Sequence, residues 1–155
     1  MGIFSALNAL VSKTPHWEEP DGRSVADSFR PEEPKRTVIL IDDDQDILDS
    51  IGPALRVEGL TVLTATSGAK GLNLLRYTPH DVEAMLLDYS MPDLDGEHTL
   101  RHARKIQPDI KIIGITGLQP DELSAGYRES VNALFYKPVR TIELLASMRE
   151  LLEIK

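Results

Sequence analysis

Four short apolar runs in this chain each end abruptly at a polar residue, and each has the length of a buried β-strand. Residues 38–41 lead into an aspartate triplet, residues 84–87 into Asp88, residues 112–115 into Thr116, and residues 134–136 into Lys137. The carboxyl ends of neighbouring parallel strands lie along one edge of a sheet, so these polar residues would meet in one pocket. Carboxylates, a hydroxyl and an ammonium together are suited to a divalent cation and a phosphoryl group.

From Thr37 onward the sequence alternates between such runs and segments with helical periodicity, which is typical of βαβ units in an α/β fold. We expect strands near residues 37–42, 60–65, 83–88, 110–116 and 133–136, with a helix after each. The fourth helix should contain Leu123 and Tyr127, and the fifth should begin at Thr141 as its N-cap. Nearly continuous apolar runs predict strands covered by helices on both faces.

Composition restricts the classes of function that remain. With 155 residues, 41% of them hydrophobic, the chain has room for one domain with a substantial core. Its net charge of -8, with no cluster of basic and aromatic residues, argues against nucleic acid as a partner. It has no cysteine, which fits a reducing compartment, so we expect a cytoplasmic protein. No segment approaches the ~20 apolar residues that a transmembrane helix needs.

Residues 1–36 differ in composition from the rest and are expected to form an N-terminal extension to a domain at 37–155. Four prolines, at positions 15, 20, 31 and 34, make residues 13–36 resemble a linker. Residues 3–11 place apolar side chains on one face at helical spacing and predict a short amphipathic helix. Such a short helix is marginal alone, so we expect it to dock on a partner, on the domain itself or on a membrane surface.

The aspartate triplet at 42–44 carries the strongest chemical signal. Adjacent carboxylates raise one another's pKa unless a cation neutralises them, and Mg²⁺ is the ion we expect at this position. Each polar residue also has a simpler interpretation. The triplet could be a solvated turn that complements a helix dipole, Asp88 a loop cap, Thr116 a structural residue and Lys137 an exposed charge. All four simpler interpretations would have to hold at four successive strand ends.

Taken together, these segments resemble the receiver domain of response regulators. The resemblance rests on VILIDDD at 38–44, LLDYSMPDLDG at 86–96, IGIT at 113–116 and YKP at 136–138, and extends over residues 37–155. It implies a flavodoxin-like, doubly wound five-stranded parallel sheet of order 2-1-3-4-5. It also implies a stand-alone receiver in a two-component or phosphorelay pathway, because nothing follows the fifth helix in this sequence.

The resemblance assigns a role to each site residue. Asp88 would be the phosphoacceptor, taking a phosphoryl group from a histidine kinase or phosphotransfer protein, with Thr116 and Lys137 contacting the phosphoryl oxygens. Mg²⁺ would be held by Asp42, through a water molecule, and by Asp43, Asp88 and the carbonyl of Ser90. The chain would then signal to a downstream protein, and it would be no enzyme beyond accepting its own phosphoryl group and slowly losing it.

One position departs from the family pattern. Three residues before the lysine, where receivers usually carry an aromatic residue that rotates during switching, this chain has Leu134. The usual coupling is therefore in question, with Phe135 and Tyr136 as alternative reporters. A phosphorylation-independent adaptor that keeps the receiver fold is the main alternative function.

Two other motifs point elsewhere. The stretch from Asp93 to Gly96 matches the core of the haloacid-dehalogenase phosphatase motif, but that motif needs its first aspartate directly after an apolar strand, and Asp93 follows a turn-rich loop. His98 and His102 have the i, i+4 spacing of a metal pair. They lack an obvious third ligand beyond Glu97, so we expect a solvated helix face.

Overall fold

The computed structural model of the chain describes residues 36–78 and 82–154, so the expected helix at 3–11 and the linker that follows it lie outside the described part. The described strands form one parallel sheet in the order β2-β1-β3-β4-β5, which confirms the predicted α/β topology. Their bounds are β1 (Thr37–Ile41), β2 (Thr61–Ala65), β3 (Val82–Asp88), β4 (Lys111–Thr116) and β5 (Ala133–Tyr136). Each lies within one residue of its predicted bounds.

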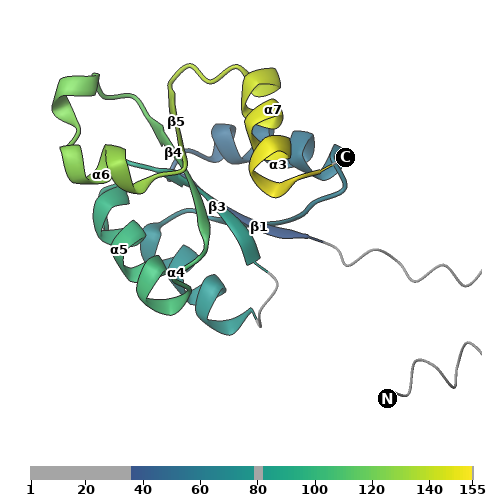
Figure 1. Cartoon of the computed structure of the whole chain (residues 1–155), viewed down its shortest axis with the longest axis horizontal. Helices are drawn as coiled ribbons and strands as arrows, with labels where there is room; N and C mark the ends of the chain where they lie inside the picture. Colours follow the sequence, from purple (N-terminus) through teal and green to yellow (C-terminus); the bar gives the residue numbers. More distant parts are fainter. Residues whose placement is uncertain (1–35, 79–81, 155) are drawn as a thin grey trace, which may run out of the picture. The chain divides into compact units, whose positions relative to one another are not determined.

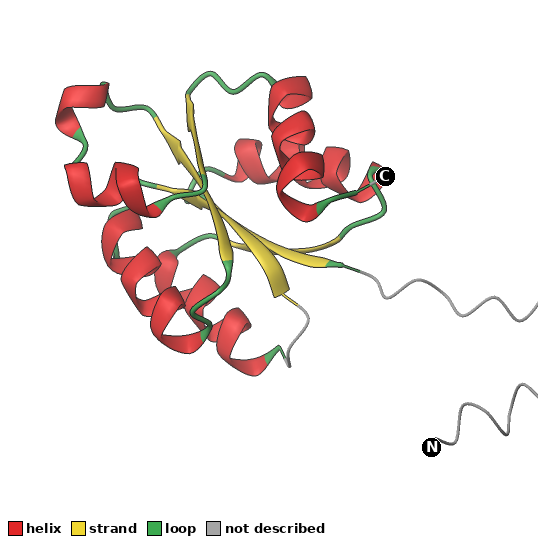
Figure 2. Cartoon of the chain, in the orientation of Figure 1, coloured by secondary structure: helices red, strands yellow, loops and turns green. Residues whose placement is uncertain are grey.

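Helices cover the sheet on both faces, as Figures 1 and 2 show. Helices α3 and α7 pack on one face, and α4, α5 and α6 pack on the other. Their bounds are α3 (Gln45–Val57), α4 (Gly68–Tyr77), α5 (Gly96–Ile106), α6 (Ala125–Ser130) and α7 (Thr141–Leu152), with a short 3₁₀ helix η1 (Pro120–Glu122) before α6.

Strand residues alternate between two hydrophobic layers. In β1, Val38 and Leu40 pack with α3 and α7, whereas Ile39 and Ile41 pack with the helices of the other face. All five β1 residues are buried, because a strand covered on both faces has no solvent side. The buried strand ends at Ile41, and the aspartate triplet follows it directly at the edge of the sheet.

Local signals in the sequence explain where most helices begin. Asp44, Ser67, Asp95 and Ser124 each accept a hydrogen bond from a backbone amide in the first turn of α3, α4, α5 and α6, respectively. Such N-caps satisfy amides that the helix itself leaves unpaired. All four caps lie in connections that leave the carboxyl edge of the sheet, so capping also helps to hold these connections in place.

Two local predictions are wrong. Thr141 is the first residue of α7 and not its N-cap, because Arg140 has the extended conformation of the cap and pairs with Glu143 in the first turn. Leu123 is outside the fourth helix, which is only six residues long and begins after Ser124. Pro120 starts the separate 3₁₀ turn there, and Leu123 ends that turn with its side chain buried.

Candidate functional site: an acidic pocket at the carboxyl edge of the sheet

The ends of β1, β3, β4 and β5 bring the predicted site residues to one edge of the sheet. In the strand register, Ile41 lies beside Leu87, Asp88 beside Ile115, and Thr116 beside Tyr136. The residues that follow these positions, Asp42 and Lys137, therefore start from adjacent points. Backbone hydrogen bonds continue past the strands, because the amide of Lys137 donates to the carbonyl of Thr116 at 2.7 Å. These backbone hydrogen bonds hold the pocket residues on the rigid strands of the sheet.

Asp42, Asp43 and Asp88 form the acidic part of the pocket. One carboxylate oxygen from each lies within 4.8 Å of the other two. Asp42 and Asp88 are buried, at 1% and 2% exposure, while Asp43 is exposed to solvent. In the described part of the chain, this is the only group of three or more histidine, cysteine or acidic side chains gathered so closely.

Lys137 supplies the positive charge in the pocket. Its Nζ donates to Asp42 Oδ2 at 2.9 Å and forms an ion pair with Asp88 Oδ1 at 3.3 Å. Burial alone would lower the pKa of Lys137, but the hydrogen bond to Asp42 and the charge of Asp88 outweigh it and raise that pKa. Lys137 is therefore held as an ammonium between two buried carboxylates.

Asp88 is the least compensated of these groups. Its pKa is raised to about 6, first by burial and then by the charge of Asp42, although Lys137 and the amide of Ser90 act in the opposite direction. The contact from Asp88 Oδ1 to Lys137 is too poorly aligned for a hydrogen bond, so this buried oxygen has no hydrogen-bond partner within residues 36–78 and 82–154. A buried carboxylate oxygen in this state is prepared to receive a cation or an electrophile.

Thr116 and Ser90 complete the set of predicted residues. Thr116 is buried, and its Oγ1 accepts a hydrogen bond from the amide of Leu118 at 3.0 Å. Its hydroxyl proton is therefore available for another acceptor. Ser90 is exposed, and its backbone amide contributes to the environment of Asp88 as described above.

Asp44, the third member of the triplet, has a different position. Its carboxylate caps α3 by accepting from the amide of Asp46, and its own amide donates to Asp42 Oδ1 at 2.9 Å. Asp44 therefore orients Asp42 through the backbone, whereas its side chain belongs to the helix.

The other candidate motifs lie outside the pocket. Asp93 is exposed, and its Oδ2 faces the amide of Ala69 at the start of α4, at 3.4 Å. His98 and His102 are exposed on α5, with Nδ1 atoms that contact Asp95 and the carbonyl of His98, respectively. Neither histidine belongs to the close-packed group of metal-ligating side chains found among the described residues.

The carboxylate pocket fits Mg²⁺. Its donors are all oxygens, as Mg²⁺ prefers, and three carboxylates face a single ammonium. Burial and the neighbouring charge of Asp42 raise the pKa of Asp88, and Asp88 Oδ1 has no hydrogen-bond partner among the described residues, so a bound cation would stabilise the ionised carboxylate. Asp42, Asp43 and Asp88 are the residues that would hold the ion.

Comparison with known proteins agrees with this geometry. The chain matches the response regulator receiver domain family over residues 38–149. A CheY-like receiver domain from Methanospirillum hungatei JF-1 is 31% identical, with a TM-score of 0.71 over 77% of this chain and 94% of that one. A receiver domain from Clostridium thermocellum is 28% identical, with a TM-score of 0.70 over 76% of this chain and 94% of that one.

Curated relatives include larger signalling proteins. The transcriptional regulatory protein GlrR of Escherichia coli (strain K12) is 33% identical over 118 residues, which are 75% of this chain and 26% of that protein. The sensor kinase CckA of Brucella abortus (strain 2308) is 31% identical over 118 residues, 76% of this chain and 12% of that protein. The chain spans about half the length or less of these and the mycobacterial PrrA relatives.

The chain belongs to the response regulator receiver domain family and is a component of two-component signalling. None of the described helices is long and apolar enough to cross a membrane.

Proposed function

We propose that Asp88 is the phosphoacceptor of this receiver and that the chain works as a phosphorylation-dependent switch. The observation that carries the proposal is the clustering of the Asp42, Asp43 and Asp88 carboxylates within 4.8 Å, with Lys137 Nζ paired to the two buried ones. No other described part of the chain combines a partly neutralised buried carboxylate with a cation site and a free hydroxyl proton.

In the proposed reaction, a carboxylate oxygen of Asp88 attacks the phosphorus of a phosphohistidine on a kinase or phosphotransfer protein. A new O–P bond forms and the P–N bond breaks, and the imidazole leaves with the electron pair of that bond. Lys137 contacts a phosphoryl oxygen and stabilises the charge that develops there. Bound Mg²⁺ would shield the phosphoryl oxygens from the carboxylates and align donor and acceptor.

Thr116 is the second residue that responds to the phosphoryl group. Its hydroxyl already accepts a hydrogen bond from Leu118 and can donate its proton to a phosphoryl oxygen. Such a bond would draw Thr116 toward Asp88 and couple the site to the segment between β4 and α6. The proposed product is a single aspartyl phosphate on each chain, which decays slowly, so the protein is an acceptor and not a turnover enzyme.

Incubation with acetyl phosphate and Mg²⁺, followed by intact mass measurement, tests this function. The wild-type chain should gain one phosphoryl group, and Asp88→Asn or removal of Mg²⁺ should abolish the gain. A chain that stays unlabelled, or that is labelled equally with Asp88→Asn, would contradict the proposal. An adaptor would bind its partner equally well with Asp88→Asn, and a phosphatase would release many equivalents of phosphate for each chain.

The same proposal implies the cellular compartment in which the chain works. The phosphoryl donor for Asp88 would be a cytoplasmic histidine kinase domain or phosphotransfer protein, so we place the chain in the cytoplasm. Its lack of cysteine is compatible with that compartment.

A further inference from the structure

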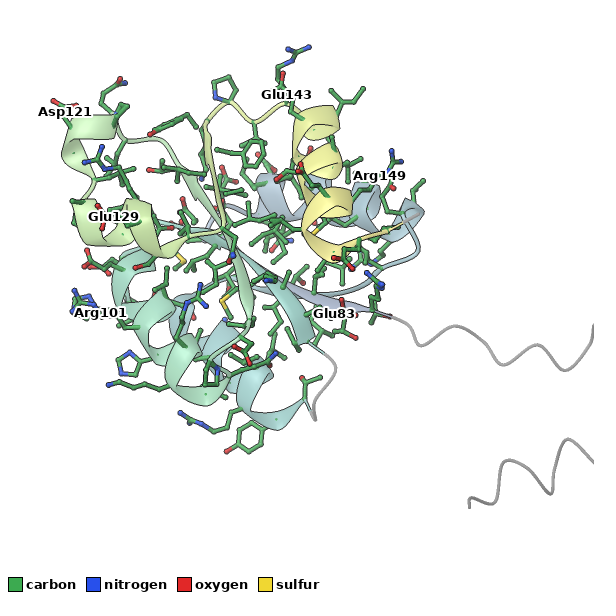
Figure 3. The ribbon with its side chains drawn as sticks, viewed as in Figure 1. Glu83, Arg101, Asp121, Glu129, Glu143 and Arg149 are labelled. Carbon is green, nitrogen blue, oxygen red and sulfur yellow. The ribbon has the colours of Figure 1, made fainter. Side chains whose placement is uncertain are left out.

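Tyr127 is a buried residue that the proposed reaction does not use. It lies on α6 with 1% of its surface exposed, and its hydroxyl has no hydrogen-bond partner within the described residues. The outer side of this part of the molecule carries charged residues such as Arg101 on α5 and Glu129 on α6, which Figure 3 shows directed away from the sheet. A phenol that is buried on the inner side without a partner is unfavourable and requires an explanation.

Gly114 in the middle of β4 provides the space that the Tyr127 ring occupies. A Cβ atom built on Gly114 would lie 2.7 Å from the Tyr127 hydroxyl and 3.3 Å from its Cε1 atom. The same atom would lie 3.0 Å from Cδ1 of Leu134, the residue beside Gly114 in the sheet register. Glycine inside a buried strand marks a close approach of another group, and here that group is the end of the Tyr127 side chain.

This position is next to the residue expected to move on phosphorylation. Gly114 lies two residues before Thr116 in β4, so both project to the same face of the sheet. The Tyr127 ring also packs edge-on against Tyr89, with ring centroids 4.7 Å apart, and Tyr89 directly follows Asp88. Tyr127 is thus in contact with the segments that carry both Asp88 and Thr116.

The charge of Asp88 reaches Tyr127. The pKa of the Tyr127 hydroxyl is raised first by burial and then by nearby acidic groups, of which Asp88 contributes most, followed by the Tyr89 phenol and Glu97. Asp88 is the largest of these electrostatic contributions, so a phosphoryl group on Asp88, which adds negative charge, would change the environment of the phenol. Lys137 faces Asp88 from β5 and partly offsets that charge.

Short-range contacts connect Tyr127 to the outer surface of α6. Ser124 caps α6 by accepting from the amide of Tyr127 and also donates to Glu97 of α5. At the other end of α6, Arg104 donates to the carbonyl of Ser130. Because α6 is only six residues long, a change at Tyr127 affects every turn of the helix.

We propose that Tyr127 on α6, and not residue 134 on β5, is the side chain that couples phosphorylation of Asp88 to the conformation of the α6 and β5 edge. The inference rests on the proposed function of Asp88. When Thr116 moves toward the phosphoryl group, it gives up the bond from the Leu118 amide, and the β4–α6 connection is free to shift. Tyr127 then moves with α6, and its hydroxyl gains the hydrogen-bond partner that it lacks in the unphosphorylated state.

Fluorine NMR on the full chain labelled with 3-fluorotyrosine tests this inference directly. The chain has four tyrosines, which can be assigned by single Tyr→Phe substitutions. On addition of acetyl phosphate and Mg²⁺, the Tyr127 resonance should shift and the resonance of Tyr77, which is 78% exposed on α4, should stay in place. Intact mass on the same samples reports whether Asp88 is phosphorylated.

The variant Tyr127→Phe removes only the hydroxyl and keeps the buried ring. We expect labelling within two-fold of wild type, but backbone amide shifts in α6 and β5 on phosphorylation should fall several-fold. Tyr77→Phe is the matched control and should preserve the full response. Gly114→Ala, which pushes against the Tyr127 hydroxyl from β4, should alter the α6 amide shifts before phosphorylation.

The outcomes separate this inference from the proposed function. A wild-type chain that takes no label would overturn both. A labelled chain in which the Tyr127 resonance stays in place, or in which Tyr127→Phe retains the wild-type response of α6, would overturn the role of Tyr127 and leave the phosphoacceptor assignment intact.

Discussion

Replacing Asp88 by asparagine should stabilise the metal-free protein at neutral pH. The pKa of Asp88 is about 6 in the folded protein, against an ordinary value of 3.8, with burial as the main cause. The folded state therefore holds the Asp88 proton more tightly than the unfolded state. Stability must fall as pH rises from about 4 to about 6, and the full cost of ionising Asp88 is present above that range.

The magnitude follows from the size of the shift. A rise of about two pKa units corresponds to roughly 2–3 kcal/mol of unfolding free energy, because each unit is worth about 1.4 kcal/mol. The amide introduced by Asp88→Asn would carry no charge and could still accept a hydrogen bond, so the variant should recover most of this energy at pH 7. At pH 4 the two proteins should differ by less than about 1 kcal/mol, because Asp88 is then largely protonated in the folded state.

Urea denaturation in EDTA at pH 4, 5.5 and 7 provides the assay, with Asp121→Asn as the control for loss of an exposed carboxylate. Mg²⁺ should reduce or reverse the advantage of Asp88→Asn at pH 7, because the ion stabilises the wild-type carboxylate cluster preferentially. If Asp88→Asn is no more stable than wild type at pH 7 in EDTA, ionisation of Asp88 does not cost the folded protein the expected free energy.

Three further substitutions probe the surroundings of the pocket. Lys137→Met should lower the free energy of unfolding by roughly 2–3 kcal/mol at pH 7 and by less at pH 5, because it leaves Asp42 and Asp88 without their ammonium. It should also reduce labelling by acetyl phosphate more than ten-fold. Urea midpoints equal to those of the wild type at both pH values would contradict this. Asn132→Ala should cost about 1–2 kcal/mol in urea denaturation, because the side-chain Oδ1 of Asn132 accepts from the backbone amide of Ile112 at 2.8 Å. Asn132→Asp, which keeps an acceptor at this position, should lose less. Gly96→Ala should cost about 2–3 kcal/mol and slow labelling, because its Cβ would lie 2.7 Å from Tyr89 Cα and 2.9 Å from the Asp88 carbonyl oxygen. A thermal midpoint no lower than that of the wild type would refute the expected clash.

The sheet was predictable because its signals are local. A run such as residues 38–41 is apolar throughout and stops at a charged residue, and a strand buried on both faces needs this pattern. The resemblance to receiver domains supplied the order of the strands. The meeting of Asp42, Asp88, Thr116 and Lys137 then follows, because the carboxyl ends of parallel strands lie along one edge of the sheet. The roles of these residues in phosphoryl transfer stay predictions that the labelling experiment decides.

Details that could not be predicted from the sequence depend on which of several neighbouring residues makes a given contact. Thr141 is a good N-cap residue, yet Arg140 takes the cap position because its side chain reaches Glu143 in the first turn. Asp44 is indistinguishable from Asp42 and Asp43 in sequence, but the helix that follows uses its carboxylate. The contact between Gly114 and Tyr127 joins a strand to a helix, and a glycine inside the apolar run was its single visible sign.

The residues around Gly114 are best understood as one packing unit. The Leu134 and Tyr127 side chains converge on the Cβ position that Gly114 leaves empty, at 3.0 and 2.7 Å, respectively. Protein interiors are filled to a nearly constant density, so an aromatic ring can enter this space from α6 only if β4 and β5 contribute small or flexible side chains. Position 134 therefore carries leucine and not an aromatic residue, because the ring of Tyr127 on α6 already fills this space.

Because they share one space, residues 127 and 134 should depend on each other for stability. Tyr127→Leu alone should cost about 2–3 kcal/mol by leaving a cavity, and Leu134→Tyr alone should cost about 1–3 kcal/mol by overpacking. In the double variant the ring enters from β5 into the space that α6 has vacated, so the combined loss should be at least about 1 kcal/mol smaller than the sum of the single losses. Urea denaturation of the four proteins measures this coupling. Additivity within about 0.5 kcal/mol would mean that the two side chains do not share one space, and the explanation for Leu134 would fail with it.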